Sequence, residues 1–272
     1  AVTAGEIAAG NLTRRVEHTD NRTEVGRLGT ALNQMLGSLE EAFAEQKASE
    51  EQLRRFVADA SHELRTPLTS IRGYAELFRR GADQRPEDLA KVMRRVDEES
   101  ARMSVLVEEL LLLARLNQGR PLDRAPVDIA QLAQDAVDDA RVVAPGRTVE
   151  LIAPEPVYVN GDEARLRQVI ANLVTNAINH TPADAPVTVS VRDEGMRAVL
   201  EVADLGPGLT AEDAQHVFEP FYRVDKGRVR SKGGGTGLGL AIVKAIVEAH
   251  AGSVATRANV PHGAVFSVAL PV

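Results

Sequence analysis

The chain has 272 residues, no cysteine and a formal net charge of −7. Without cysteine it can form neither a disulfide framework nor a thiolate metal site. The excess of acidic residues and an aromatic content of only 3% argue against a nucleic-acid partner, which needs a basic face or stacking side chains. No apolar run approaches the roughly 18 residues of a membrane-spanning helix. The length suits more than one compact domain.

Residues 1–46 begin with a short helical end and a connector that carries apolar Leu12 and Val16. A helical pattern follows from Glu24 through Met35. This segment resembles the latter part of a HAMP domain, in which each protomer of a dimer contributes two parallel helices to a four-helix bundle. A generic coiled-coil linker is the alternative interpretation.

Two helices with an apolar stripe are predicted over about 49–80 and 87–117, joined by a turn at Gly81–Pro86. The 4-3 spacing that marks a helix packed on partner helices already begins upstream. Its positions are Leu32, Leu36, Leu39, Phe43, Leu53, Val57, Ala60 and Leu64. The second helix has one apolar row at Leu89, Val96, Met103 and Leu110, and another at Val92, Leu106 and Leu113. Such a hairpin cannot close its own core, so we expect two copies to form a dimeric four-helix bundle.

His62 lies in the first of these helices but off its apolar stripe, and we therefore expect it on the outermost face. A carboxylate follows it at once, Glu63, and a hydroxyl lies one turn further along, Thr66. For this segment alone, a solvated surface histidine without a role is the simpler interpretation.

Beyond about residue 126 the pattern changes to alternating strands and helices. Asp128 is placed to cap a helix that ends near Arg141, and further helices are predicted over 162–179 and 236–249. The predicted strands are Thr148–Ile152, Val157–Asn160, Val187–Val191, Ala198–Ala203, Ser253–Arg257 and Val265–Leu270. This order indicates a two-layer α/β sandwich.

Four further motifs follow the His62 segment in this second half of the chain. They are Asn172–Thr181, Asp204–Gly208, Phe218–Phe221 and Gly233–Leu240. The set resembles the H, N, G1, F and G2 boxes of bacterial two-component sensor histidine kinases over nearly the whole chain. The resemblance implies a partial HAMP domain at 1–46, a dimerisation and phosphotransfer hairpin at 47–119, and a catalytic ATP-binding domain of the GHKL type at 120–272.

The resemblance assigns several residues to a nucleotide. Asp204 would select adenine, and Gly206 and Gly208 would take positive φ and leave space for the base. A plain Asx turn is the alternative for this motif alone. The glycine-rich segment Gly233–Leu240 leads into a helix whose backbone N–H groups can hold phosphates. Its assigned residues are Gly235, Gly237, Leu238 and Gly239. Arg223 opens a basic segment with Lys226, Arg228, Arg230 and Lys232, for which a solvated loop is the alternative.

On the helix that precedes these motifs, Asn176 occupies the family's Mg²⁺ position, and Asn172 lies one turn earlier on the same face. Asn179 and His180 depart from the family, which often has a basic residue and an aromatic residue there. Asn179 cannot supply a charge to the phosphates, whereas His180 can still stack or hydrogen-bond near the nucleotide.

Position 172 separates two functions. The related ATPases of the gyrase type carry Glu there as a base for water, whereas Asn cannot take a proton. We therefore predict a protein-histidine kinase that uses ATP and Mg²⁺ to phosphorylate His62, with Glu63 orienting the imidazole and accepting its other proton. The phosphate would then pass to an aspartate of a response regulator, and Thr66 would position water for phosphatase activity. An ATP-binding dimeric scaffold without phosphotransfer and a hydrolytic ATPase are the alternatives.

The family also implies partners and a location. We expect a homodimer, a cognate response-regulator receiver domain as partner, and no nucleic acid. A membrane segment upstream of residue 1 would place the full-length protein in the cell membrane, with this portion facing the cytoplasm and soluble by itself.

Overall fold

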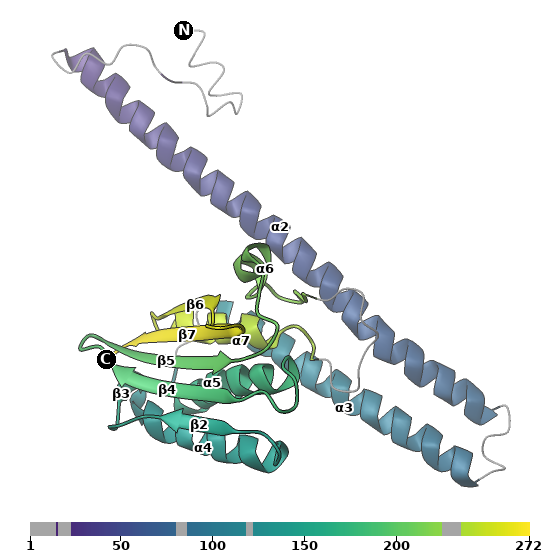
Figure 1. The fold of residues 1–272 in the computed structure, drawn as a ribbon. Helices are drawn as coiled ribbons and strands as arrows, with labels where there is room; N and C mark the ends of the chain where they lie inside the picture. Colours follow the sequence, from purple (N-terminus) through teal and green to yellow (C-terminus); the bar gives the residue numbers. More distant parts are fainter. Residues whose placement is uncertain (1–14, 16–22, 80–85, 118–121, 225–234) are drawn as a thin grey trace. The chain divides into compact units, whose positions relative to one another are not determined.

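The computed structural model describes residue 15 and residues 23–79, 86–117, 122–224 and 235–272 (Figure 1). The chain divides into two units, residues 1–62 and 63–272. Most of the predicted turn at Gly81–Pro86 lies outside the described residues, as do the boundary at 119–120 and nearly all of the segment 1–22. No helix within the described ranges is long and apolar enough to cross a membrane.

Helix α2 runs from Glu24 to Arg79 without a break. At its start, the Thr23 hydroxyl accepts a hydrogen bond from the Gly26 N–H at 3.0 Å. We predicted a separate helix from about residue 49, but residues 38–66 contain neither Gly nor Pro, so no helix-breaking residue lies near the predicted boundary. Several residues of its apolar stripe remain exposed in the single chain, namely Leu39, Phe43, Leu53 and Val57.

Helix α3 spans Pro86–Asn117. Pro86 stands at its first position, where the missing N–H costs no hydrogen bond. The two predicted apolar rows differ in burial. Val92, Leu106 and Leu113 are buried, whereas Leu89, Val96, Met103 and Leu110 are half-buried.

The C-terminal domain contains a five-stranded sheet in the order β2-β4-β5-β7-β6. Its strands are β2 (Val149–Ile152), β4 (Val187–Asp193), β5 (Arg197–Asp204), β7 (Ala264–Pro271) and β6 (Ser253–Ala258). Among the strands that the structure describes, only β2 and β4 pair in parallel. Alternate residues of β4, such as Val187, Val189 and Val191, are buried, as expected for a strand with one face on a core.

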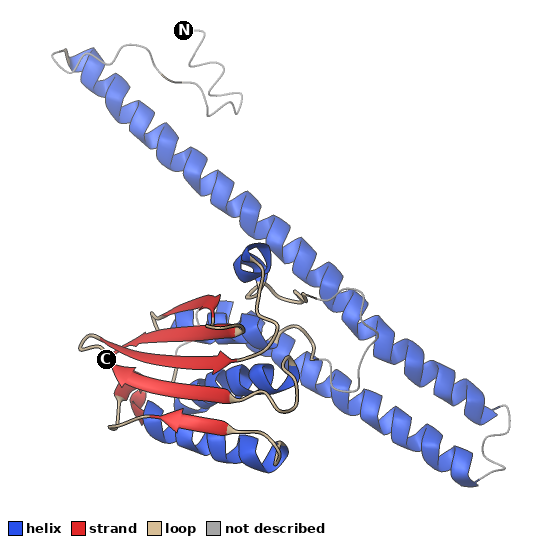
Figure 2. Ribbon diagram, in the orientation of Figure 1, coloured by secondary structure: helices blue, strands red, loops and turns tan. Residues whose placement is uncertain are grey.

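Three helices cover one face of this sheet, which gives the predicted two-layer sandwich (Figure 2). They are α4 (Ile129–Val143), α5 (Glu163–Asn179) and α7 (Gly239–Ala249). Asp128 and Asp162 cap the first two through backbone N–H groups, as their positions predicted. The core between the layers contains fully buried Leu173, Ile242 and Ile246.

Three features of this domain differ from the sequence-based expectation. A four-residue strand, β1 (Ala125–Asp128), pairs with β3 (Tyr158–Gly161) and was not predicted. A short helix, α6 (Ala211–His216), was also missed. Helix α7 begins at Gly239 rather than at residue 236, because Gly237 adopts a φ of 76° that no right-handed helix accommodates.

Candidate active site

His62 is exposed on α2, as its place off the apolar stripe predicted. Glu63 and Thr66 are half-buried, and Thr66 follows His62 by one helical turn. All three side chains belong to an uninterrupted helix, which fixes their spacing. This segment therefore presents an accessible imidazole with a carboxylate and a hydroxyl nearby in sequence.

The N motif is positioned by the burial of α5. Leu166, Ile170 and Leu173 face the core, so Asn172 and Asn176 lie half-buried at the edge of that face. Asn172 Nδ2 donates to the Gly239 carbonyl oxygen at 3.2 Å. This bond joins the N box (Asn172–Thr181) to the G2 box (Gly233–Leu240), the glycine motif at the start of α7. The Asn176 side chain has no hydrogen-bond partner in the described part of the chain.

Asp204 ends β5, as predicted, and only 6% of its surface is exposed. Its Oδ1 accepts hydrogen bonds from the Gly206 N–H at 2.8 Å and from the Ala264 N–H at 3.2 Å. Its Oδ2 accepts none from the residues that the structure describes. A carboxylate oxygen that has no donor from the protein is suited to an incoming amine such as that of adenine.

The two glycines after Asp204 have different roles, which corrects our expectation that both take positive φ. Gly208 does so, with φ of 75°, but Gly206 does not. Gly206 is required for lack of space, because a Cβ there would lie 2.7 Å from Thr181 Cγ2. The G1 motif is thus packed directly against the segment that follows α5.

The glycine motif before α7 is held by the F motif. The Phe221 N–H donates to the Gly237 carbonyl oxygen at 2.9 Å, and a Cβ on Gly237 would lie 3.0 Å from Phe221 Cα. Leu238, the N-cap residue of α7, is fully buried and its side chain makes no capping hydrogen bond. The first backbone N–H groups of α7 are therefore not occupied by the side chain of the N-cap residue. Gly235 is exposed at the beginning of this described segment.

Thr236 connects the same motif to helix α3. Its hydroxyl donates to Glu109 Oε2 at 2.7 Å and accepts from the Leu238 N–H at 3.2 Å. Burial raises the pKa of the Glu109 carboxyl, and the hydrogen bond from Thr236 opposes this shift. A carboxylate from the helical hairpin therefore lies against the loop that would hold phosphates.

The remaining predicted residues lie at the edges of this region. Asn179 is the last residue of α5 and His180 is its C-cap, and both are exposed. Arg223 is exposed next to the undescribed range 225–234. Lys226, Arg228, Arg230 and Lys232 fall within that range, so their predicted approach to phosphates lies outside the described residues.

Sequence reasoning missed several residues that support the G1 motif. Asn259 Nδ2 donates to the Asp204 carbonyl oxygen at 2.8 Å, and His262 Nδ1 lies 3.2 Å from the Gly206 carbonyl oxygen. Both belong to the turn between β6 and β7. Arg147, from the segment between α4 and β2, binds the chain just after α5. They stand far from the motifs in sequence, and no spacing pattern could have identified them.

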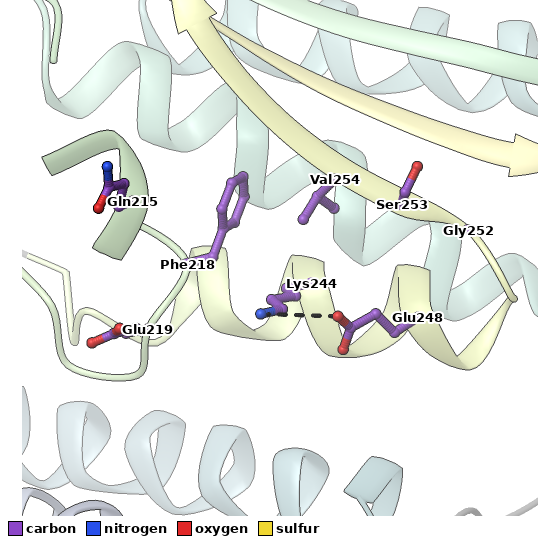
Figure 3. A pocket seen from close by; sticks show the side chains of 8 residues that line it. All are labelled: Gln215, Phe218, Glu219, Lys244, Glu248, Gly252, Ser253 and Val254. Atoms are coloured by element: carbon purple, nitrogen blue, oxygen red, sulfur yellow. Dashed lines mark ion pairs between the residues drawn. The ribbon is translucent and has the colours of Figure 1, made fainter. Parts of the chain in front are cut away.

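A separate pocket of about 380 Å³ lies beside the outer side chains of α7 (Figure 3). Lys244 and Glu248 form an ion pair of 3.9 Å on its wall, and Phe218 and Glu219 of the F motif line it. None of the asparagines or glycines assigned to the nucleotide borders it. We therefore do not assign it to the nucleotide, whose predicted residues converge between α5, the end of β5 and the start of α7.

Comparison with known proteins yields three successive family matches. Residues 161–272 match the model "Histidine kinase-, DNA gyrase B-, and HSP90-like ATPase", residues 52–119 match "His Kinase A (phospho-acceptor) domain", and residues 1–41 match the HAMP domain. The first match contains all the residues assigned to the nucleotide, and the second contains His62.

Individual relatives agree. The "Probable sensor histidine kinase TcrY" of Mycobacterium tuberculosis is 51% identical over 92% of this chain and 52% of its own length. The structure of histidine kinase AdeS of Acinetobacter baumannii is 27% identical with a TM-score of 0.58, over 77% of this chain and 97% of that one.

The full-length ShkA structure in complex with AMPPNP is 29% identical with a TM-score of 0.58, over 80% of this chain and 45% of that one. The chain spans about half the length of the curated relatives it matches. The order of the three matched domains, together with these identities, shows that the chain belongs to the bacterial two-component sensor histidine kinases.

Proposed function

We propose that this chain is the signalling and kinase portion of a sensor that transfers phosphate from ATP to His62. The observation that carries the proposal is at position 172. The side chain there is an amide that donates to the Gly239 carbonyl oxygen, so it cannot act as a base for water. A site that holds ATP without such a base retains the phosphate for an external nucleophile, and His62 supplies an exposed one.

The residues present fit an adenine nucleotide. Only 6% of the Asp204 surface is exposed and its Oδ2 accepts no hydrogen bond from the described chain, while Gly206 leaves no side chain between Asp204 and Thr181. The start of α7 offers backbone N–H groups to an anion. The AMPPNP complex of the related ShkA supports the same use of this fold.

A magnesium ion also fits, through Asn176. Its amide is half-buried one turn after Asn172 and is not engaged elsewhere in the described chain. Among the described residues, no three His, Asp or Glu side chains cluster as a metal site, so the ion would depend on phosphate oxygens as well as on this amide. When bound, it supplies positive charge to the transferring phosphate.

The remaining steps follow the family. Glu63 orients the His62 ring and accepts its second proton, and the phosphate passes to an aspartate of a response-regulator receiver domain. Thr66, one turn from His62, positions a water that hydrolyses the aspartyl phosphate of the regulator and releases inorganic phosphate, which is the phosphatase activity. The exposed stripe of α2 and the half-buried row of α3 support a homodimer, and an upstream segment would attach the whole protein to the membrane.

The test is incubation with Mg²⁺ and γ-labelled ATP, comparing the chain with its His62→Gln variant. We expect acid-labile, base-stable label that is lost in the variant, because the glutamine amide cannot accept the phosphate. Glu63→Gln should label more slowly while binding ATP normally. ATP binding without any label would contradict the kinase and favour the scaffold, whereas ATP hydrolysis that survives His62→Gln would favour the hydrolytic ATPase.

A further inference from the structure

Arg147 is a buried arginine whose side-chain partners all lie in one short segment of another element. Only 8% of its surface is exposed. Its Nη2 donates to the carbonyl oxygens of Pro182 at 2.6 Å and Thr181 at 3.3 Å. Its Nη1 donates to the Ala177 carbonyl oxygen at 3.3 Å and to Thr181 Oγ1. None of these acceptors is a carboxylate. The guanidinium therefore holds backbone carbonyl groups and one hydroxyl in place rather than pairing with an acidic side chain.

This segment is the C-terminal end of α5, where the helix needs such a group. The last carbonyl groups of a helix lack partners within it and carry a partial negative charge. The last turn of α5 contains no basic residue of its own. Arg147 supplies the missing cation and several donors at once, from the loop before β2. It therefore determines the direction in which the chain leaves the helix that carries Asn176.

Thr181 transmits this arrangement to the G1 motif. Its hydroxyl accepts from Arg147 and donates to the Ala177 carbonyl oxygen at 2.6 Å, so both interactions fix its rotamer. Its methyl group then packs on Gly206, where an added Cβ would lie 2.7 Å away. The Gly206 N–H in turn binds Asp204 Oδ1 at 2.8 Å. Arg147, Thr181, Gly206 and Asp204 thus form a continuous series of contacts.

We propose that Arg147 is a positioning residue for the adenine base, which it acts on through Thr181 and the G1 motif without touching the nucleotide. The inference rests on the proposed binding of ATP at this site. It differs from a purely structural role in one respect. Loss of Arg147 should weaken recognition of the base more than recognition of phosphates, because its contacts lead to Asp204 and not to the start of α7.

The experiment compares Arg147→Met with Arg141→Met in the full chain. Arg141 is a matched control, because its guanidinium also donates to a backbone carbonyl, that of Val149 at 2.9 Å, but it does not contact the end of α5. Binding of Mg²⁺–ATP, Mg²⁺–GTP and inorganic tripolyphosphate is measured by calorimetry, well below each variant's unfolding temperature.

For Arg147→Met we expect a loss of roughly tenfold or more in ATP affinity, a smaller ATP-to-GTP preference, and little change for tripolyphosphate. Arg141→Met should keep the wild-type affinities even where it lowers the unfolding temperature. Arg147→Lys keeps the cation but reaches fewer of the acceptors, so its ATP affinity should be intermediate, and it replaces the methionine variant if that one does not fold.

Wild-type ATP affinity and base preference in the folded Arg147 variants would overturn the inference alone, and an equal loss for all three ligands would do the same. A wild-type chain that binds no ATP would overturn the proposed function and the inference together. A loss of ATP affinity and of the ATP-to-GTP preference, without a loss of tripolyphosphate affinity and without any change in Arg141→Met, would establish Arg147 as the positioning residue.

Discussion

His250 is a buried histidine that joins two elements around the nucleotide domain. It is 2% exposed, its Nε2 accepts the Asp162 N–H at 3.0 Å, and its Nδ1 lies 2.8 Å from the Ile246 carbonyl oxygen. These contacts need a neutral ring protonated at Nδ1. Burial lowers the pKa of this imidazole; the Ile246 carbonyl and Asp162 oppose the shift, and Arg124 adds to it. The residue therefore connects the end of α7 to the start of α5 only in its neutral form.

A pH dependence of stability follows from this depressed pKa. The unfolded chain binds the proton more readily than the folded one, so the contribution of His250 is complete above its ordinary pKa of about 6.5 and is lost as pH falls through the lower folded value. We expect the unfolding temperature to fall on acidification, and less steeply in His250→Gln. Thermal unfolding measured across this range, for both chains, checks the difference between the slopes. Equal slopes would contradict the assignment.

At the scale of single residues, the sequence identified groups whose chemistry is local. Asp204 was recognisable because it ends an apolar strand and precedes two glycines, and His62 because it lies off the apolar stripe of its helix. The space requirement at Gly206 could not be predicted, because it comes from Thr181 across the fold. Arg147 was missed for the same reason, since an isolated arginine between two elements looks like any surface residue.

A hydrogen bond from Asn172 to the Gly239 carbonyl oxygen links α5 and α7, the two helices that bear the N and G2 boxes. Asn172→Asp would replace the donor to the Gly239 carbonyl oxygen with a carboxylate that repels it. We expect a loss of about 1–3 kcal/mol in the free energy of unfolding, because a half-buried acceptor would then face an acceptor. Denaturant unfolding measures it. Asn172→Ala removes the bond without the repulsion and should cost less, so an equal cost would contradict this explanation.

At the scale of elements, long regular segments were predictable and short ones were not. The caps at Asp128 and Asp162 and the alternation in β4 are properties of local sequence. Strand β1 has four residues including Pro126 and pairs with β3. Its own sequence has no strand pattern, because the strand depends on this pairing. Helix α2 was predicted as two pieces because a domain boundary was expected near residue 46, although the residues there favour an uninterrupted helix.

At the scale of the molecule, the described chain leaves an apolar stripe of α2 without a cover. Leu53 is 60% exposed and Val57 is 55% exposed. Side chains of this size rarely repeat at heptad spacing on a helix unless another helix covers them. A second copy of the chain is the partner that the kinase proposal requires, since two hairpins close a four-helix bundle.

The dimer can be tested by adding charge to that stripe. The double variant Leu53→Glu and Val57→Glu places two carboxylates where the proposed partner helix packs, and burial of unpaired charge is strongly unfavourable. We expect light scattering after size-exclusion chromatography to show a monomer, with labelling of His62 reduced. The control, Gln52→Glu and Ala58→Glu, adds the same charge to exposed neighbours off the stripe and should remain dimeric. A dimer in both variants would place the interface elsewhere, and a monomer in both would mean that net charge, rather than the stripe, controls association.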